Sequence, residues 1–552
     1  MSRINTGRIL TSRILTHKGY SIVKASLDEK TTKEAIEQLT VAPKVNIRYA
    51  GKDGAPSFKL YKESPLRWYF PRAWAIEKFG PPDSEVLSEG TSLSSTAAEF
   101  KGTPYQYQTD IIEKFVNAGA NGLICVPCGK GKTFMALRIA SLLQKRFLIV
   151  VDKEFLMNQW KGEITALMPN LRVGILQSDT HQIGTETITE KALGLTELKA
   201  LAKQAGLRVG GTKDELTARL KEANVDYTPK SETVQYDCTI CMIQTLCLQT
   251  FADGTFNDYG FTIFDECHHL GAQHFSKTLQ KIQTKKMLGL SATPTREDGL
   301  SKVFHWFLGP PIHWEKTREP DPQVEVQAVF IKSNDLVYNT IPTNWRGEPV
   351  MGTLLTNVLG CEERNQEIAK RLLEFCKEPL RKILVLSERI GHLQMIESLI
   401  TAAAPAIIIS YYIGGMKEVE REEGAAAAQV LLASYAMASE AMNIKTLNTV
   451  ILASPRKNVE QSTGRILRVR PDQRQVHPII VDIVDVHRMY RSQWKKRSIY
   501  YKKCTYNVTG MPKNTIGDTH VEVEVEVDAD SDSDSETKTK AKTKANGCLF
   551  IE

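Results

Sequence analysis

Residues 127–133, with the sequence PCGKGKT, have the types and spacing that bind a triphosphate. Gly129 and Gly131 let backbone N–H groups curl around an anion, and the N–H groups at the start of a following helix face it. Lys132 adds a positive charge, and Thr133 offers a hydroxyl to Mg²⁺. The loop therefore predicts a binding site for a nucleoside triphosphate and its magnesium ion.

The residues on either side of this loop fit the same interpretation. An apolar run at 122–126 precedes it and a stretch of helical character at 134–140 follows it, which gives the order strand, turn, helix. The full pattern places a glycine five residues before Gly131, where this chain has Val126. A glycine- and lysine-rich surface turn is therefore an alternative that the loop alone leaves open.

Two consecutive carboxylates, Asp265 and Glu266, end the apolar run at 261–264. If this run is a buried strand, Asp265 can reach the Mg²⁺ held by Thr133, and Glu266 can orient and deprotonate the attacking water. Two acids at the end of a strand are otherwise often a solvated turn. Their order and distance along the chain from the glycine loop favour the catalytic interpretation.

Two arginines complete the predicted catalytic set. Arg465 and Arg468 lie three residues apart on a presumed helix, so they share a face and can reach the γ-phosphate as arginine fingers. Gln461 precedes them at motif spacing, and Ser291 and Thr293 follow another apolar run, where their hydroxyls could couple the nucleotide site to a neighbouring domain. If the loop and the arginines lie in different domains, domain closure and ATP hydrolysis are linked.

The adenine ring needs its own contact. Residues 104–108, PYQYQ, offer aromatic and amide groups just before the first strand. Gln108 is the predicted adenine contact because Ile111 and Ile112 follow it in helical register, and Gln106 is the second choice.

Four segments resemble motifs I, II, III and VI of the superfamily 2 helicases. They are the glycine loop, DECH at 265–268, SAT at 291–293 and QSTGRILR at 461–468. In this superfamily a small or apolar residue can take the place of the first glycine, as Val126 does here. The joint occurrence of the four segments in the right order makes the resemblance specific.

Other segments are similar to the XPB-like branch, which includes related helicases of large DNA viruses and phages. They are PCGxGK in the loop, RED at 296–298 and YIGGMK at 412–417, within a resemblance that covers residues 100–505. The resemblance implies ATP-dependent movement along DNA from 3′ to 5′ and a coupling role for Arg296. Ala441 and Asn443 stand where the branch usually has glycine and aspartate, which affects the ribose contact and the strength of coupling.

The expected fold class is α/β, with two RecA-like P-loop domains in tandem, a small N-terminal α+β domain and a helical insertion. Short apolar runs alternate with helical stretches, which is typical of a parallel sheet. The predicted strands of the first domain are residues 122–126, 147–151, 173–176, 238–243, 261–264 and 287–290, and those of the second are 324–330, 382–386, 406–410, 429–433, 449–453 and 479–483. The predicted boundaries are 1–95 for the N-terminal accessory domain, 96–304 for the first RecA-like domain, 305–323 for a linker, 324–510 for the second RecA-like domain and 511–552 for a disordered, charged tail.

A segment at 188–226 makes one crossover of the first domain longer than usual. Two amphipathic helices, 196–205 and 213–222, are predicted there, joined by residues 206–212, and the segment resembles a SAP module, a compact DNA binder. A helical hairpin that only decorates the surface is the alternative. The predicted small core is Leu198, Leu201, Leu207, Val209, Leu216 and Leu220, and the predicted phosphate contacts are Lys199, Lys203, Arg208, Lys213 and Arg219. Thr245 is a weaker candidate for contact with a strand backbone.

Two aromatic and basic segments remain ambiguous. Residues 66–74, LRWYFPRAW, could clamp nucleic acid with Arg67 and Arg72, or could form the core of the N-terminal domain, which is the favoured interpretation. Residues 487–497 could likewise touch nucleic acid or pack Trp494 inward. A strand is also expected at 45–49.

Composition limits the classes of protein to which this chain can belong. The net charge of +7 permits nucleic acid without requiring it, and no run approaches the twenty apolar residues of a membrane helix. The pairs Cys125/Cys128 and Cys238/Cys241 do not have the character of zinc sites, since the first lies in the phosphate loop and residues three apart on a strand face opposite ways.

We therefore predict an intracellular ATP-dependent motor on single-stranded and duplex DNA, in cytoplasm, nucleus or virion, with transcription or repair proteins as candidate partners. The alternatives are an RNA-directed helicase or transcript-release factor, and a non-catalytic DNA-binding scaffold.

Overall fold

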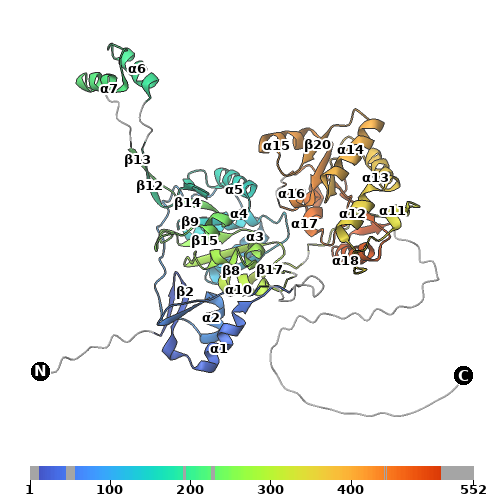
Figure 1. Ribbon diagram of the computed structural model, residues 1–552, viewed down its shortest axis with the longest axis horizontal. Helices are drawn as coiled ribbons and strands as arrows, with labels where there is room; N and C mark the ends of the chain where they lie inside the picture. Colours follow the sequence, from blue (N-terminus) through green and yellow to red (C-terminus); the bar gives the residue numbers. More distant parts are fainter. Residues whose placement is uncertain are drawn as a thin grey trace. The chain divides into compact units, whose positions relative to one another are not determined.

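The computed structural model describes residues 12–44, 56–189, 194–225, 231–296, 298–316, 318–440, 442 and 444–510. The predicted strand at 45–49, the charged tail, Ala441 and Asn443 lie outside these residues. The rest forms an N-terminal domain, two α/β domains and a helical insert (Figure 1). Among the described residues, no helix combines the length and the apolar character needed to cross a bilayer.

The first α/β domain, called domain 1 below, is built on one mainly parallel sheet. Its strands run in the order β11-β10-β14-β9-β15-β16-β8-β17, and among the described residues only the pairing of β10 with β11 is antiparallel. The elements are α3 Gln106–Asn117, β8 Asn121–Cys125, α4 Lys132–Leu143, β9 Phe147–Val151, α5 Glu154–Leu167, β10 Val173–Gln177, β11 Thr180–His181, β14 Cys238–Met242, α8 Ile243–Leu248, β15 Phe261–Phe264, α9 Ser276–Leu279, β16 Lys286–Ser291, α10 Ser301–Leu308 and β17 Pro311–Trp314.

The second α/β domain, domain 2, has a parallel sheet in the order β20-β21-β19-β22-β23-β18-β24. Apolar side chains fill both faces of this sheet, as a sheet covered on both sides by helices requires. The elements are β18 Glu325–Phe330, α11 Leu336–Asn339, α12 Met351–Gly360, α13 Glu362–Phe375, β19 Ile383–Ser387, α14 Ile390–Ala403, β20 Ile409–Tyr412, α15 Glu418–Ala427, β21 Val430–Ser434, α16 Tyr435–Glu440, β22 Thr449–Leu452, α17 Glu460–Thr463, β23 Ile479–Val484, α18 Arg488–Lys503 and β24 Asn507–Thr509.

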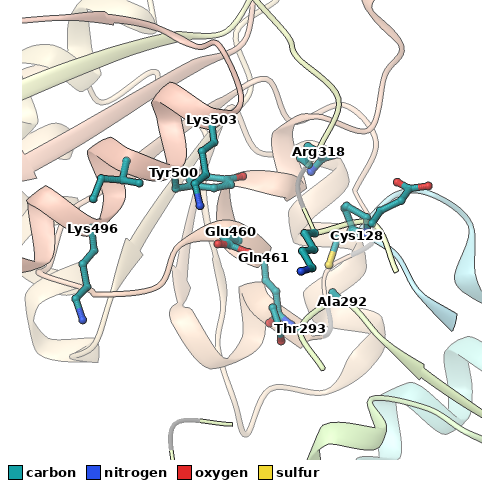
Figure 2. A pocket seen from close by; sticks show the side chains of 13 residues that line it. Cys128, Ala292, Thr293, Arg318, Glu460, Gln461, Lys496, Tyr500 and Lys503 are labelled. Atoms are coloured by element: carbon teal, nitrogen blue, oxygen red, sulfur yellow. The ribbon is translucent and has the colours of Figure 1, made fainter. Parts of the chain in front are cut away.

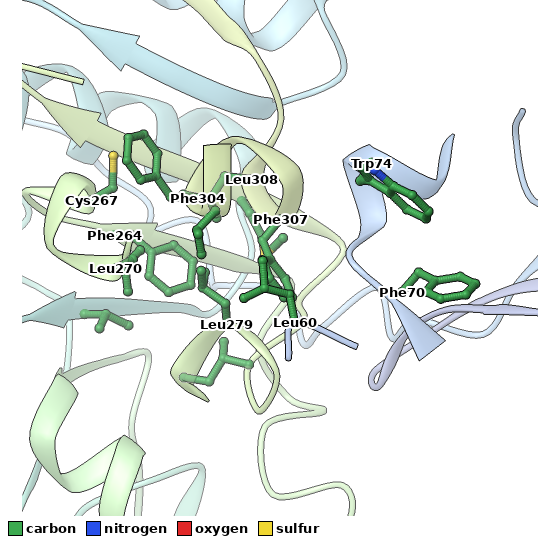
Figure 3. Packing of buried hydrophobic residues seen from close by; sticks show 14 of the residues in the cluster. Leu60, Phe70, Trp74, Phe264, Cys267, Leu270, Leu279, Phe304, Phe307 and Leu308 are labelled. Carbon is green, nitrogen blue, oxygen red and sulfur yellow. The ribbon is translucent and has the colours of Figure 1, made fainter. Parts of the chain in front are cut away.

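The N-terminal domain has a five-stranded sheet, a separate two-stranded sheet and two α-helices in its described residues, and it shares its core with domain 1. Apolar residues of both domains form one continuous cluster, in which Phe304 and Phe307 of α10 are packed together with Leu60 (Figure 3). Its elements are β1 Arg13–Thr16, β2 Gly19–Val23, α1 Glu29–Gln38, β3 Thr40–Val41, β4 Phe58–Lys59, β5 Lys62–Glu63, β6 Arg67–Phe70, α2 Arg72–Phe79 and β7 Ser84–Glu85.

The aromatic segment of this domain is part of that core. Trp68, Phe70 and Trp74 are buried and pack against one another. Arg72 is also buried, and its guanidinium donates to the carbonyls of Thr284 and Lys285 and to Asn121 Oδ1. Arg72 therefore fastens the N-terminal domain to domain 1, and the alternative in which it clamps nucleic acid is wrong.

Two boundaries differ from those expected. Strand β17 pairs with β8, so domain 1 continues to Trp314 and the linker begins after it, not at residue 305. Residues 91–98 have the small and polar side chains of a linker, yet Leu93, Ala97 and Ala98 pack in the core of domain 1. In both cases a stretch that resembles a connection packs against residues distant in the sequence.

The insert stands on a two-stranded antiparallel ribbon, β12 Thr185–Thr189 with β13 Ser231–Gln235. Helices α6 Leu195–Gln204 and α7 Lys213–Glu222 match the predicted pair within one residue at each end. Leu198, Ala202, Leu216 and Leu220 form its separate core, and Leu201 and Leu207 pack against it. Val209 was expected in this core but is 42% exposed, because the connecting segment turns it outward.

Candidate functional site

The glycine loop joins β8 to α4 in the predicted manner. Gly129 and Gly131 have φ angles of +89° and +80°, which side chains rarely adopt. A Cβ atom at Gly131 would also lie 2.4 Å from Gln108 Nε2. Helix α4 starts at Lys132, so its first N–H groups are available at the loop, as an anion requires.

Lys132 and Glu266 form an ion pair at the centre of the site. Lys132 Nζ lies 3.1 Å from Glu266 Oε1, and the two side chains are only 13% and 17% exposed. Burial acts to raise the pKa of Glu266, but the charge of Lys132 and the hydrogen bond from His268 outweigh it and hold that pKa below its ordinary value. The lysine that was predicted to bind phosphate is thus paired with the predicted general base.

The two adjacent carboxylates have different environments. Burial, followed by the charge of Glu266, raises the pKa of Asp265 to about 6. Glu266 itself has a φ angle of +42°, a strained conformation for a residue with a side chain. The turn after β15 therefore presents two buried acids whose pKa values are shifted in opposite directions.

The predicted coupling residues connect with the same turn. His268 Nδ1 lies 3.3 Å from Glu266 Oε2 and 3.0 Å from Ser291 Oγ. The Thr293 N–H donates to Ser291 Oγ at 3.1 Å, and Arg296 donates to the His268 carbonyl at 2.7 Å. His268 was part of the DECH segment but had no predicted role; its ring links the Glu266 carboxylate to the end of β16.

The two arginines lie side by side, although not on one continuous helix. Helix α17 ends at Thr463 and is followed by a 3₁₀ turn, Gly464–Ile466. Arg465 Nη1 and Arg468 Nη2 both donate to the Met442 carbonyl, at 2.9 and 2.7 Å. Burial and the charge of Arg465 lower the pKa of Arg468 to about 10. The two arginines lie next to each other, as predicted. They do so because both donate to the Met442 carbonyl, and not because they share one face of a helix.

A pocket of 180 Å³ lies at the glycine loop (Figure 2). Cys128, Thr293 and Gln461 line it, together with Arg318 from the linker. The Arg318 guanidinium lies against the backbone of Gly464, so close that a Cβ atom added at Gly464 would be 2.7 Å from Arg318 Nη1. Sequence reasoning missed Arg318, because linker residues carry no motif that marks them.

Gln108 occupies a place different from the predicted one. It is buried, its Oε1 accepts the Tyr105 N–H at 3.0 Å, and its Nε2 donates to the Lys130 carbonyl at 3.1 Å. Both ends of the amide are therefore engaged in fixing α3 and the glycine loop, and the amide is not presented to an adenine. Gln106 is exposed and donates to Asp110.

The predicted nucleic-acid contacts divide into two groups. Thr245 is buried and its Oγ1 accepts the Ser178 N–H at 3.0 Å, so a direct contact with a phosphate would require that bond to break. Arg219 donates to the carbonyls of Arg208 and Gly210, so its side chain stabilises the fold of the insert. The predicted phosphate contacts with exposed side chains on the insert are Lys199, Lys203, Arg208 and Lys213.

Comparisons with known proteins agree with this geometry. A family model described as type III restriction enzyme, res subunit, matches residues 101–296, within domain 1. The DNA 3′-5′ translocase XPB2 of Sulfurisphaera tokodaii is 26% identical over 269 residues, 49% of this chain and 48% of that protein. L396 of Acanthamoeba polyphaga mimivirus, named as a candidate ATP-dependent RNA helicase, is 31% identical over 507 residues, 90% of this chain and 86% of the relative. The chain belongs to the XPB-like superfamily 2 helicases.

Other relatives are consistent with this family. QP509L of African swine fever virus (isolate Warthog/Namibia/Wart80/1980), also named as a candidate ATP-dependent RNA helicase, is 24% identical and covers 73% of each chain. Apart from these relatives, the solved structure of T4 UvsW aligns with 88% of this chain and 96% of its own at 17% identity, with a TM-score of 0.30. As a superfamily 2 helicase, the protein hydrolyses ATP and acts on nucleic acid, so the scaffold alternative is wrong.

Proposed function

We propose that this helicase is a DNA-directed motor that couples ATP hydrolysis to 3′-to-5′ movement. The insert carries the proposal, because it is a separately packed two-helix module with lysines at its surface. Such a module adds a backbone-binding surface to a motor whose motifs do not read bases. We assign the contacts to Lys199, Lys203, Arg208 and Lys213.

The residues for the nucleotide are those of the glycine loop and the turn after β15. Gly129, Gly131 and Lys132 are assigned to the phosphates. Thr133 and Asp265 are assigned to Mg²⁺, since a hydroxyl and a buried carboxylate are the oxygen ligands that this ion prefers. When bound, Mg²⁺ neutralises charge on the phosphates.

We assign proton transfer to Glu266. Its carboxylate has a lowered pKa and is paired with Lys132, so it is ionised at neutral pH and can accept a proton from water once phosphate replaces it as the partner of Lys132. Arg465 and Arg468 are assigned to the transition-state charge, and Gln461 is assigned to the same catalytic set. In that step they would exchange the Met442 carbonyl for phosphate oxygens.

Coupling is assigned to Ser291, Thr293 and Arg296. Their hydrogen bonds link the general base, through His268, to the pocket that also contains Gln461. A change at the phosphate can thus reach this pocket, which Gln461 of domain 2 also lines, through these hydrogen bonds.

The names of the relatives point to two kinds of substrate, DNA and RNA. XPB2 of Sulfurisphaera tokodaii is named a DNA 3′-5′ translocase, and XPB-R of Trypanosoma brucei brucei a DNA repair helicase/translocase. L396 and QP509L are named as RNA helicases, which favours RNA as the second candidate. In our proposal the insert favours DNA over RNA.

Steady-state ATPase activity tests the proposal, measured without nucleic acid and with matched single-stranded DNA, duplex DNA and RNA at fixed salt. We expect stronger stimulation by DNA than by RNA. Stimulation mainly by RNA would replace the DNA motor with the RNA-directed alternative. Displacement of a triplex-forming strand from either end of a DNA track reports the direction of movement.

The insert is tested by a deletion that leaves its stalk intact. Thr189 pairs with Ser231 in the ribbon, so residues 190–230 can be replaced by Asn-Gly, which closes a two-residue hairpin. We expect loss of duplex-DNA affinity with unchanged basal ATPase activity.

A charge-reversal pair refines this test. The double change Lys199→Glu with Lys203→Glu should weaken DNA binding and make it less dependent on salt. The slope of the logarithm of the binding constant against the logarithm of the salt concentration should become shallower by up to about 0.9 for each phosphate that is no longer neutralised. Lys30→Glu with Lys33→Glu, two exposed lysines of α1, makes the same change in net charge and is the matched control. Equal effects of the two pairs would contradict the assignment.

A further inference from the structure

A buried tryptophan contacts the proposed metal carboxylate. Trp160 lies on α5 and is 1% exposed, with its ring in the core of domain 1. Its indole Nε1–H donates to Asp265 Oδ2 at 2.9 Å. None of the four segments that resemble motifs I, II, III and VI includes this residue.

The two oxygens of Asp265 are held by different elements. Oδ2 accepts from Trp160 on α5, and Oδ1 accepts the N–H of Glu266 at 3.0 Å. Two donors from separate directions fix the plane of a carboxylate, whereas the backbone donor alone would leave it free to turn. Indole has no acceptor atom and a single donor, so the ring itself is held in one orientation by this bond.

Burial makes this arrangement rigid. The ring of Trp160 is enclosed by apolar residues of domain 1, so its N–H cannot turn to water. A buried donor without a partner is costly, which means that Asp265 and Trp160 each stabilise the position of the other. A ligand held in this way loses little freedom when a metal binds.

We propose that Trp160 is the positioning residue of the Asp265 carboxylate at the Mg²⁺–nucleotide site. This inference rests on the proposed role of Asp265. Trp160 acts through Asp265 and touches neither nucleotide nor water in the reaction. Its loss should weaken metal binding in the presence of nucleotide and leave the binding of nucleotide alone unchanged.

The test uses the full chain and Mn²⁺ as a spectroscopic substitute for Mg²⁺. Free Mn²⁺ is measured by electron paramagnetic resonance in titrations of the protein with ADP. For Trp160→Phe we expect a loss of Mn²⁺ affinity of about tenfold or more, the range for removed partners of metal ligands. Metal-free ADP affinity, measured by calorimetry, should stay within twofold of that of the unaltered protein.

The control is Trp74→Phe. Trp74 is also buried, at 5% exposed, and its indole N–H donates to Gln38 Oε1 at 3.3 Å in the N-terminal domain. This change removes the same chemical group away from the site and should leave Mn²⁺ affinity unchanged. If Trp160→Phe lowers the melting temperature so far that binding is unmeasurable, β-(3-benzothienyl)alanine at position 160 keeps the ring shape and removes only the N–H.

The outcomes separate this inference from the proposed function. Mn²⁺ affinity within twofold of the unaltered protein in a folded Trp160 variant overturns the inference, and so does an equal loss in Trp74→Phe. Asp265→Asn should abolish Mn²⁺ binding with ADP; if it does not, the proposed role of Asp265 fails, whatever Trp160 does.

Discussion

Replacing Glu266 by Gln should tighten ATP binding while it stops turnover. In the structure Glu266 is paired with Lys132 at an Nζ–Oε1 distance of 3.1 Å, so a bound phosphate would have to displace it. Coulomb's law with an effective dielectric constant of about 20 gives about 5 kcal/mol for this pair. The amide keeps a weaker, neutral interaction with Lys132, so we expect about 1.5–3 kcal/mol of this to appear as ATP affinity, which corresponds to about 10–100-fold.

The measurement is equilibrium binding of ATP with Mg²⁺, together with steady-state turnover with saturating nucleic acid. Turnover should fall by about 10²–10⁴-fold, the usual contribution of a general base. Asp265→Asn is the matched control because it makes the same carboxylate-to-amide change one residue earlier. We expect it to weaken ATP binding in the presence of Mg²⁺, since it removes a proposed metal ligand.

Two results would refute this reasoning. Turnover retained in Glu266→Gln would remove the general-base assignment. Loss of turnover with unchanged or weaker ATP affinity would show that the Lys132–Glu266 pair does not oppose phosphate binding.

Three further predictions concern other parts of the chain. Gly131→Ala should abolish ATP binding without unfolding domain 1, because its φ angle is +80° and its Cβ would meet Gln108 Nε2 at 2.4 Å; wild-type affinity by calorimetry would contradict this. Arg72→Met should cost about 1–3 kcal/mol of stability by leaving buried acceptors unpaired, with DNA affinity unchanged, and a denaturant titration beside a DNA-binding curve checks both. His392, buried between Ser387 and Asn365, has a pKa lowered by burial and by Arg364 to about 3. Below pH 6.5, the ordinary pKa of histidine, the unfolded chain binds a proton at His392 while the folded chain does not. The contribution of neutral His392 to the free energy of unfolding is therefore full above pH 6.5, and it falls by about 1.4 kcal/mol between pH 7.5 and 5.5. Urea unfolding of His392→Gln should lack this part of the pH dependence.

Local sequence was sufficient for the elements that are buried on both faces. Strands β9 and β15 were predicted to the residue, because a central strand of a parallel sheet is a short run of apolar side chains with polar residues after it. The insert helices were found for a similar reason, since their apolar residues recur at helical spacing around a small core.

Elements that depend on a distant partner were not predictable in this way. Strand β17 was assigned to a linker, and β24 was not expected, because each is an edge strand whose pairing with β8 or β18 leaves little trace in its own residues. The role of Arg72 was likewise ambiguous, since an arginine beside aromatics has the same local sequence whether it faces a phosphate or a buried carbonyl.

The sequence by itself determined which residues have the chemistry: the glycine loop, the paired carboxylates and the arginines, together with the family that combines them. The tertiary structure decided how they are paired. It placed Lys132 on Glu266, both arginines on Met442 and the Gln108 amide on the loop, and it brought Trp160 to Asp265. A motif records the type and order of side chains along the chain, whereas a hydrogen bond depends on the distance and direction between atoms, which exist only once the sheet and its helices have packed.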